Sequence, residues 1–70
     1  MNGKVLMKFL EENNYHLERV KGSHHIMDNG SVSVSVPIHG NSDIARGTLA
    51  SILKDSGLTE KFRSVYGKIK

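Results

Sequence analysis

The sequence predicts an α+β fold in which helices at both ends of the chain enclose a short run of antiparallel strands. Apolar residues recur at helical spacing near the N-terminus, and helical spacing returns from about residue 45. Between them, residues 31–36 alternate strictly between serine and valine, which is typical of a half-buried strand. We find no repeat, linker or low-complexity stretch, so the pattern predicts one domain over residues 1–70.

The first predicted helix spans about residues 3–13, with charged residues on one face and apolar residues on the other. The Asn13-Asn14 pair is expected to end it. Residues 15–20 follow as a strand, enriched in strand-forming residues but with imperfect alternation. The predicted apolar face of the helix consists of Val5, Leu6, Phe9 and Leu10.

The Asn29-Gly30 pair predicts a two-residue hairpin turn between residues 24–28 and 31–36, because it supplies the positive φ angles of such turns. This turn would pair Asp28 with Ser31. The further pairs would be Met27 with Val32, His25 with Val34, and His24 with Ser35.

Cross-strand partners point to the same face of a sheet. His25 is therefore expected on the helix-covered face with Met27 and the valines, and His24 on the open face. A three-residue loop over residues 29–31 would exchange these assignments. The open face would also carry Ile26, Ser33 and Ser35. Residues 21–23, as a three-residue turn, would likewise place Leu17 opposite Met27 and Val20 opposite His24.

A second helix is predicted over about residues 45–56, with Gly57 as its left-handed stop. Pro37 and the polar run 39–43 form the preceding loop. A short third helix is predicted over residues 59–66 through Phe62, Val65 and Tyr66. The apolar face of the second helix would consist of Ala45, Leu49, Ile52 and Leu53.

Composition limits the function classes. A chain of 70 residues buries a thin core, and without cysteine it has neither disulfides nor thiolate metal ligands, which favours a cytoplasmic protein. The apolar stretch at residues 5–10 is too short and too soon interrupted by charge to be a signal peptide or membrane span. The net charge of +3 is compatible with a nucleic-acid partner, although many small basic proteins have none.

Residues 22–25, Gly-Ser-His-His, are the strongest candidate for chemistry. A histidine can accept and donate a proton at neutral pH, which attack by an RNA 2′-hydroxyl on its own phosphate requires. His24 is the candidate catalytic group. Lys21 and the backbone N–H groups of Gly22 and Ser23 would hold the phosphate, and Ser23 or Ser35 would orient it. The competing interpretation is a histidine that merely begins a strand.

No metal site is predicted. Adjacent strand residues point to opposite faces, so His24 and His25 do not readily bind one ion, and His16 and His39 lack acidic companions at ligand spacing. His25 alone is compatible with a packed residue and His39 with a loop residue. Lys8, Arg46 and Lys54, on the predicted helices, are each compatible with a solvated face.

Three segments together resemble the HicA family of toxin endoribonucleases: KGSHHI at residues 21–26, VPIHG at 36–40, and DIARGTLASILKDSGL at 43–58. The resemblance extends from the first helix to Phe62. It implies a fold similar to double-stranded RNA-binding domains, α-β-β-β-α, with helices on one face of a three-stranded antiparallel sheet. The hairpin at residues 28–30 is shorter than usual for the family, and the tail at 67–70 lies outside the pattern.

The resemblance also implies an activity and a partner. The activity is metal-independent cleavage of mRNA that stops translation, without a small-molecule cofactor, restrained by a HicB-type antitoxin that covers the active site. The essential histidine of the family maps onto His24, with His25 as second candidate. Lys21, Arg46 and Lys54 would contact phosphates. The alternatives are a non-catalytic RNA-binding module and a protein-interaction domain completed by its partner.

Overall fold

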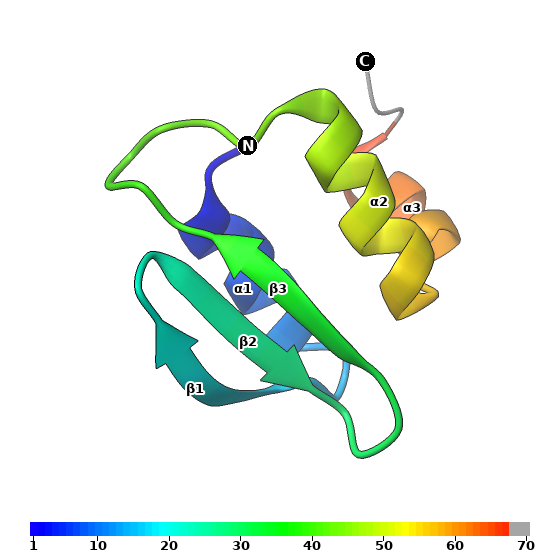
Figure 1. Ribbon diagram of the computed structural model, residues 1–70. Coiled ribbons are helices and arrows are strands. Elements are labelled where there is room, and N and C mark those ends of the chain that lie inside the picture. The colour runs from blue at the N-terminus through cyan, green and yellow to red at the C-terminus, as the bar shows by residue number, and fades with distance from the viewer. Residues whose placement is uncertain (68–70) are drawn as a thin grey trace.

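The computed structural model describes residues 1–67 and has three helices around one sheet (Figure 1). The strands form an antiparallel sheet in the order β1-β2-β3, with α1 behind it and α2 alongside β3 (Figure 1). This architecture confirms the predicted α+β fold and is consistent with a double-stranded RNA-binding-domain-like arrangement. Residues 68–70, part of the predicted domain and tail, lie outside the described residues. The elements are α1 (Gly3–Glu11), β1 (His16–Lys21), β2 (His24–Asp28), β3 (Ser33–Pro37), α2 (Arg46–Ser56) and α3 (Thr59–Tyr66).

Helix α1 has a defined cap at each end. The backbone N–H of Val5 donates to the side-chain oxygen of Asn2 (3.0 Å), which begins the helix. After the helix, the side-chain amide of Asn13 donates to the carbonyl of Phe9 (2.8 Å), and Asn14 takes a positive φ of 72°. The helix itself ends at Glu11, two residues before the predicted Asn13, and Asn13 and Asn14 lie in the turn that follows it. Val5 itself is 41% exposed, so its predicted place on the buried face is wrong.

The core lies between the sheet and the three helices. Tyr15, directly before β1, is buried, and its hydroxyl donates to the carbonyl of Ser56 at the end of α2 (3.0 Å). Gly57 ends α2 with a φ of 74°, as predicted. Ala45 and Val65 are exposed, contrary to their predicted apolar roles, whereas the ring of the partly exposed Tyr66 packs against Phe9 and Phe62, with centroids 5.9 and 4.8 Å apart. The buried apolar residues are Leu6, Phe9, Leu10, Tyr15, Met27, Val34, Val36, Ile44, Leu49, Ile52, Leu53 and Phe62.

The β2–β3 loop is longer than predicted. Asp28 pairs with Ser33 rather than Ser31, so the loop contains residues 29–32. Asn29 does not take the positive φ that the predicted turn needs. Instead its side-chain oxygen accepts the backbone N–H groups of Ser31 (2.8 Å) and Val32 (2.7 Å), which stabilises a wider turn.

The corrected register keeps the predicted faces of the two histidines. Met27 lies opposite Val34 and His25 opposite Val36, each displaced by two residues from the prediction. Because side chains alternate with a period of two, a shift of two leaves every residue on its face. His24 now pairs with Pro37 instead of Ser35. Val32, expected beside Met27 in the core, lies in the loop and is 37% exposed.

The β1–β2 turn is shorter than predicted, and β1 contains a bulge. Lys21 pairs with His24 and Val20 with His25, so only Gly22 and Ser23 form the turn. The predicted pairing of Val20 with His24 is wrong, whereas that of Leu17 with Met27 is confirmed. The register shifts between Leu17 and Arg19, so Glu18 is the extra residue of a bulge.

The segment between β3 and α2 is held against the N-terminus. The N–H of Ile44 donates to the carbonyl of Met1 (2.8 Å), and the terminal amino group lies 3.4 Å from an oxygen of Asp43. Gly3 packs so closely beneath this segment that a Cβ there would lie 2.5 Å from the carbonyl oxygen of Pro37. The N-terminus and α1 therefore determine where the chain runs after β3.

Candidate functional site

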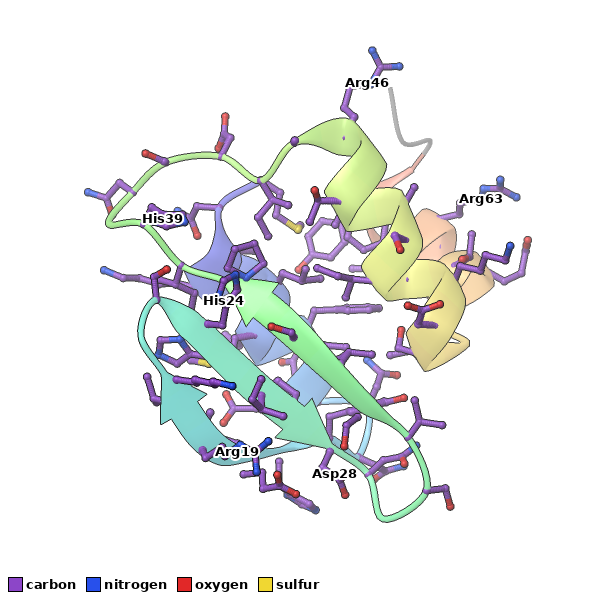
Figure 2. All side chains as sticks on the ribbon, in the orientation of Figure 1. Arg19, His24, Asp28, His39, Arg46 and Arg63 are labelled. Carbon is purple, nitrogen blue, oxygen red and sulfur yellow. The ribbon has the colours of Figure 1, made fainter. Side chains whose placement is uncertain are left out.

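His24 begins β2 on the face of the sheet that α1 does not cover, and its side chain is exposed (Figure 2). Its register partners are Lys21 on β1 and Pro37 on β3. Directly paired residues have their side chains on the same face, about 4.5–5.5 Å apart at Cβ. The structure therefore places an accessible imidazole beside an exposed ammonium group, at the end of the sheet next to the β1–β2 turn.

The bulge in β1 decides which cations share this face. Leu17 pairs with Met27 on the helix-covered face. In a regular strand Arg19, two residues later, would point to that same face. The extra residue Glu18 reverses the alternation, so Arg19 pairs with Ile26 on the open face. Arg19 and Lys21 consequently lie on the His24 side, roughly 6.8 Å apart along the strand at 3.4 Å per residue.

Arg19 was not among the residues predicted for the site. The signal for it was present in the sequence, because Leu17 and Val20 are three residues apart and cannot both face the core in a regular strand. The imperfect alternation noted for residues 15–20 marks the bulge. Locating the bulge at Glu18, and hence placing Arg19, needed the register.

The backbone of the β1–β2 turn is accessible to a ligand beside His24. Gly22 has a φ of 61°, and apart from its chain neighbours no residue has an atom within 4 Å of the position that a Cβ would occupy. Ser23 is half-buried, and its carbonyl accepts the N–H of Ile38 (2.8 Å), which ties the turn to the chain beyond β3. The predicted phosphate-holding segment of Lys21, Gly22 and Ser23 is thus contiguous with His24.

Ser35 lies diagonally across from His24 on the same face and lines a pocket between β3 and α2. The pocket has a volume of about 420 Å³. Its α2 wall carries the carboxylate of Asp55, which disfavours a phosphate at that end. Its lining residues are Ser33, Val34, Ser35, Gly47, Thr48, Ser51, Ile52 and Asp55.

The two predicted cations of α2 are not part of this cluster. Arg46 begins α2 and points away from the sheet (Figure 2). Lys54 is exposed near the other end of the helix and does not line the pocket. The structure therefore brings Lys21, Gly22, Ser23, His24 and Ser35 together and leaves Arg46 and Lys54 apart from them.

His25 occupies a different environment from His24. It pairs with Val20 and Val36 on the helix-covered face and is half-buried. Its Nδ1 atom is buried without a hydrogen-bond partner among the described residues. A substrate on the open face meets His24 first, and reaching His25 requires passage around the sheet edge.

Acidic charge on β2 is concentrated at the end opposite His24. Asp28 accepts hydrogen bonds from the Ser33 hydroxyl and from the N–H of Gly30 (2.6 Å), and these bonds hold the pKa of its carboxyl below the usual value. His16, paired with Asp28 across β1, lowers that pKa further. Four residues of strand, roughly 13 Å, separate this carboxylate from His24.

The described part of the chain contains neither a metal cluster nor a membrane-spanning helix. Among residues 1–67, no three His, Asp or Glu side chains gather closely enough to hold a metal ion. None of the helices in that range is long and apolar enough to cross a bilayer.

Fold and site together define a small α+β protein with a double-stranded RNA-binding-domain-like architecture and an accessible histidine flanked by cations. The family model described as HicA toxin of bacterial toxin-antitoxin matches residues 3–58, which include α1, the sheet, α2 and all the residues of the site. The chain belongs to this HicA toxin family. Comparison with curated proteins found no match.

Proposed function

We propose that this HicA family toxin is a metal-independent endoribonuclease that cleaves mRNA and thereby inhibits translation. The observation that carries the proposal is the direct pairing of Lys21 with His24 on the open face of the sheet. Cleavage of RNA needs a group that exchanges protons near neutral pH and positive charge that stabilises the phosphorane-like transition state. This pair supplies both at one point of the surface.

In the proposed reaction the neutral imidazole of His24 removes the proton of a ribose 2′-hydroxyl. The 2′-oxygen attacks the adjacent phosphorus, and the bond to the 5′-oxygen of the next nucleotide breaks. The ammonium group of Lys21 balances the charge on the non-bridging phosphate oxygens, and the Gly22-Ser23 backbone approaches them closely because Gly22 has no side chain. A bound metal is not needed for any of these steps.

The strand geometry also suggests how the RNA lies. Arg19 and Lys21 are separated by about the distance between successive phosphates of an extended RNA strand, so the backbone would run along β1 with the cleaved bond at His24. Ser35, diagonal to His24, would orient the nucleotide from the β3 side. Arg46 and Lys54 stay predicted phosphate contacts, and their positions restrict them to flanking parts of the RNA.

The same exposed face suggests the mode of inhibition. A HicB-type antitoxin that covers His24, Lys21 and Arg19 would exclude RNA, and acidic side chains on it would complement the cations. Since mRNA and translation are cytoplasmic, we propose that the protein acts in the cytoplasm.

A cleavage assay with purified protein and single-stranded RNA, in the presence of a chelator, tests the proposal. We expect cleavage by the parent, a fall of about 10²–10⁴-fold in rate for His24→Ala, and a smaller effect for His25→Ala. His16→Ala removes an exposed histidine from the far end of β1 and serves as the matched control. Full cleavage by folded His24→Ala would overturn the assignment.

The second candidate function, a non-catalytic RNA-binding module, is favoured by the fold alone. Proteins of similar fold bind duplex RNA by shape through phosphate and 2′-hydroxyl contacts. Under that function the parent binds duplex RNA without cleaving any RNA, and His24→Ala leaves binding unchanged. Assays of the parent and the same variants therefore distinguish the two functions.

A further inference from the structure

His39 belongs to the Val-Pro-x-His segment of the sequence, and the proposed function leaves it without a role. It lies just beyond β3, before a turn in which the N–H of Ser42 donates to the carbonyl of His39 (3.0 Å). Its side chain is exposed. Figure 2 shows His39 and His24 at the same end of the molecule, although fifteen positions of sequence numbering separate them.

The β-ladder continues past the end of β3 by one hydrogen bond, which indicates the side on which His39 lies. His24 pairs with Pro37, and the next hydrogen bond joins the N–H of Ile38 to the carbonyl of Ser23 (2.8 Å). The Ile38 side chain packs against the core, since its Cγ1 is the side-chain atom nearest to a Cβ built on Gly3. Because side chains alternate in extended backbone, a continuation of β3 through Ile38 would return His39 to the face of His24.

With the register of the ladder extended by two residues beyond Pro37, the two histidines become diagonal neighbours. Pro37 is the direct partner of His24, and the residues two before and two after it are Ser35 and His39. Diagonal neighbours lie about 7–8 Å apart, a separation that aromatic side chains can span. Two imidazole rings at this separation can contact opposite sides of one phosphate group between them.

Charged groups around His39 come from three segments. Lys21 lies across His24 at the end of β1, and His24 itself begins β2. Asp43, in the same loop as His39, is drawn toward the terminal amino group at 3.4 Å. The carboxylate of this loop is therefore paired with another cation, and the charged groups that the sheet contributes at this end are the proposed base and phosphate ligand.

We propose that His39 is the second proton-transfer group of the site and donates the proton to the departing 5′-oxygen. The inference rests on the proposed ribonuclease function. Neutral His24 accepts the 2′-hydroxyl proton while the 2′-oxygen forms its bond to phosphorus. The bond between phosphorus and the 5′-oxygen breaks, its electron pair stays on that oxygen, and protonated His39 supplies the proton. The products are a 2′,3′-cyclic phosphate and a 5′-hydroxyl, with no oxidant, reductant or metal consumed.

The first measurement is the pH profile of kcat/KM for RNA cleavage. A base and an acid together give a bell-shaped profile for the parent. His39→Ala and His39→Gln should each lower the maximum by about 10²–10⁴-fold and lose the limb that falls at high pH. His24→Ala should lose the limb that rises at low pH. His16→Ala, an exposed histidine at the other end of the sheet, should keep the full profile.

The second measurement uses RNA whose scissile 5′-oxygen is replaced by sulfur. A thiol has a pKa near 8.5, about seven units below that of water, so a thiolate leaves without prior protonation. We expect the sulfur substrate to restore most of the rate that His39→Ala and His39→Gln lose. His24→Ala should stay slow on both substrates, because attack by the 2′-hydroxyl still needs a base.

The outcomes separate this inference from the proposed function. A parent protein that cleaves neither substrate overturns both. A parent that cleaves RNA, with His39 variants that equal it or are equally impaired on both substrates, overturns the role of His39 alone. Circular dichroism and thermal unfolding show whether each variant is folded, and His39→Gln, which retains a polar side chain of similar size, replaces His39→Ala if the latter unfolds.

Discussion

Lys21 and His24 form the last residue pair of the β1–β2 ladder and lie on the open face of the sheet. From the sequence, Lys21 was expected inside the turn, where its direction was undefined. The structure makes it the direct cross-strand neighbour of the candidate base, with Arg19 on the same face. RNA binding and proton transfer are thus expected to depend on neighbouring residues of one β-hairpin.

Removing either open-face cation should weaken RNA binding and reduce its dependence on salt. For Arg19→Ala and Lys21→Ala we expect the slope of log K against log salt to fall by about 0.7 for each phosphate of single-stranded RNA that the variant no longer neutralises. Arg63→Ala is the control of equal charge, because Arg63 is an exposed arginine that pairs with a nearby glutamate, as Arg19 does with Glu18 (3.6 Å), but lies on α3 away from His24 (Figure 2). Binding titrations at several salt concentrations measure the slopes. Equal losses of affinity in all three variants would show that only net charge matters.

A side chain at Gly3 should destabilise the protein, whereas one at Gly47 should not. A Cβ at Gly3 would lie 2.5 Å from the carbonyl oxygen of Pro37 and 2.6 Å from Cγ1 of Ile38. Such overpacking costs about 1–3 kcal/mol of unfolding free energy. Apart from its chain neighbours and the backbone of its own helix, nothing lies within 4 Å of a Cβ at Gly47, so there alanine should stabilise α2 by about 0.5–1 kcal/mol. Urea unfolding of Gly3→Ala and Gly47→Ala gives both values, and equal stability of the two variants contradicts the packing argument.

Because of Tyr15, the stability of the fold should depend on pH in the alkaline range. Burial, and secondarily the negative charge of Asp28, raise the pKa of its hydroxyl above the ordinary value of 10.0. A raised folded-state pKa stabilises the protein below the unfolded-state pKa, and this stabilisation is lost as pH rises through the folded-state value. Tyr15→Phe also removes the hydrogen bond to Ser56, at a cost of about 0.5–1.5 kcal/mol near neutral pH.

Thermal unfolding between pH 7 and 11 measures both effects of Tyr15. The difference between parent and Tyr15→Phe should be largest near neutral pH and shrink above pH 10, because only the parent must expose an ionising phenol on unfolding. A difference that stays constant across this range contradicts the linkage.

Asp28 should link the stability of the β2–β3 loop to acidic pH, with the opposite sign. Its pKa is lowered, first by the hydrogen bond from Ser33 and then by that from Gly30. The stabilisation is present above the ordinary aspartate pKa, about 3.9, and is lost as pH falls through the lower folded-state value. Asp28→Asn should therefore be less stable than the parent at pH 7, with the difference disappearing in acid. Asp55→Asn, the same charge change on exposed α2, should show no such convergence in acid unfolding experiments.

Agreement between the predicted and observed elements depends on which interactions are local. The end of α2 at Gly57 was predicted correctly and that of α1 to within two residues, because caps involve near neighbours in the chain. The β2–β3 pairing was displaced because the Asn29 side chain bonds the backbone of Ser31 and Val32, which competes with the turn that its neighbour Gly30 suggested. The displacement of two residues left His24 on its predicted face.

The order of helices and strands and the opposite faces of His24 and His25 could be predicted from the sequence, because both follow from periodicity along a single segment. The shared face of Lys21, Arg19 and His24, and the position of His39 at the same end of the molecule as His24, became visible only in the folded chain (Figure 2). The first depends on a bulge at Glu18 and the second on a ladder that extends to Ile38. Register between strands is set by turn geometry and by packing against the helices. Neither can be predicted from the residue pattern of one strand alone.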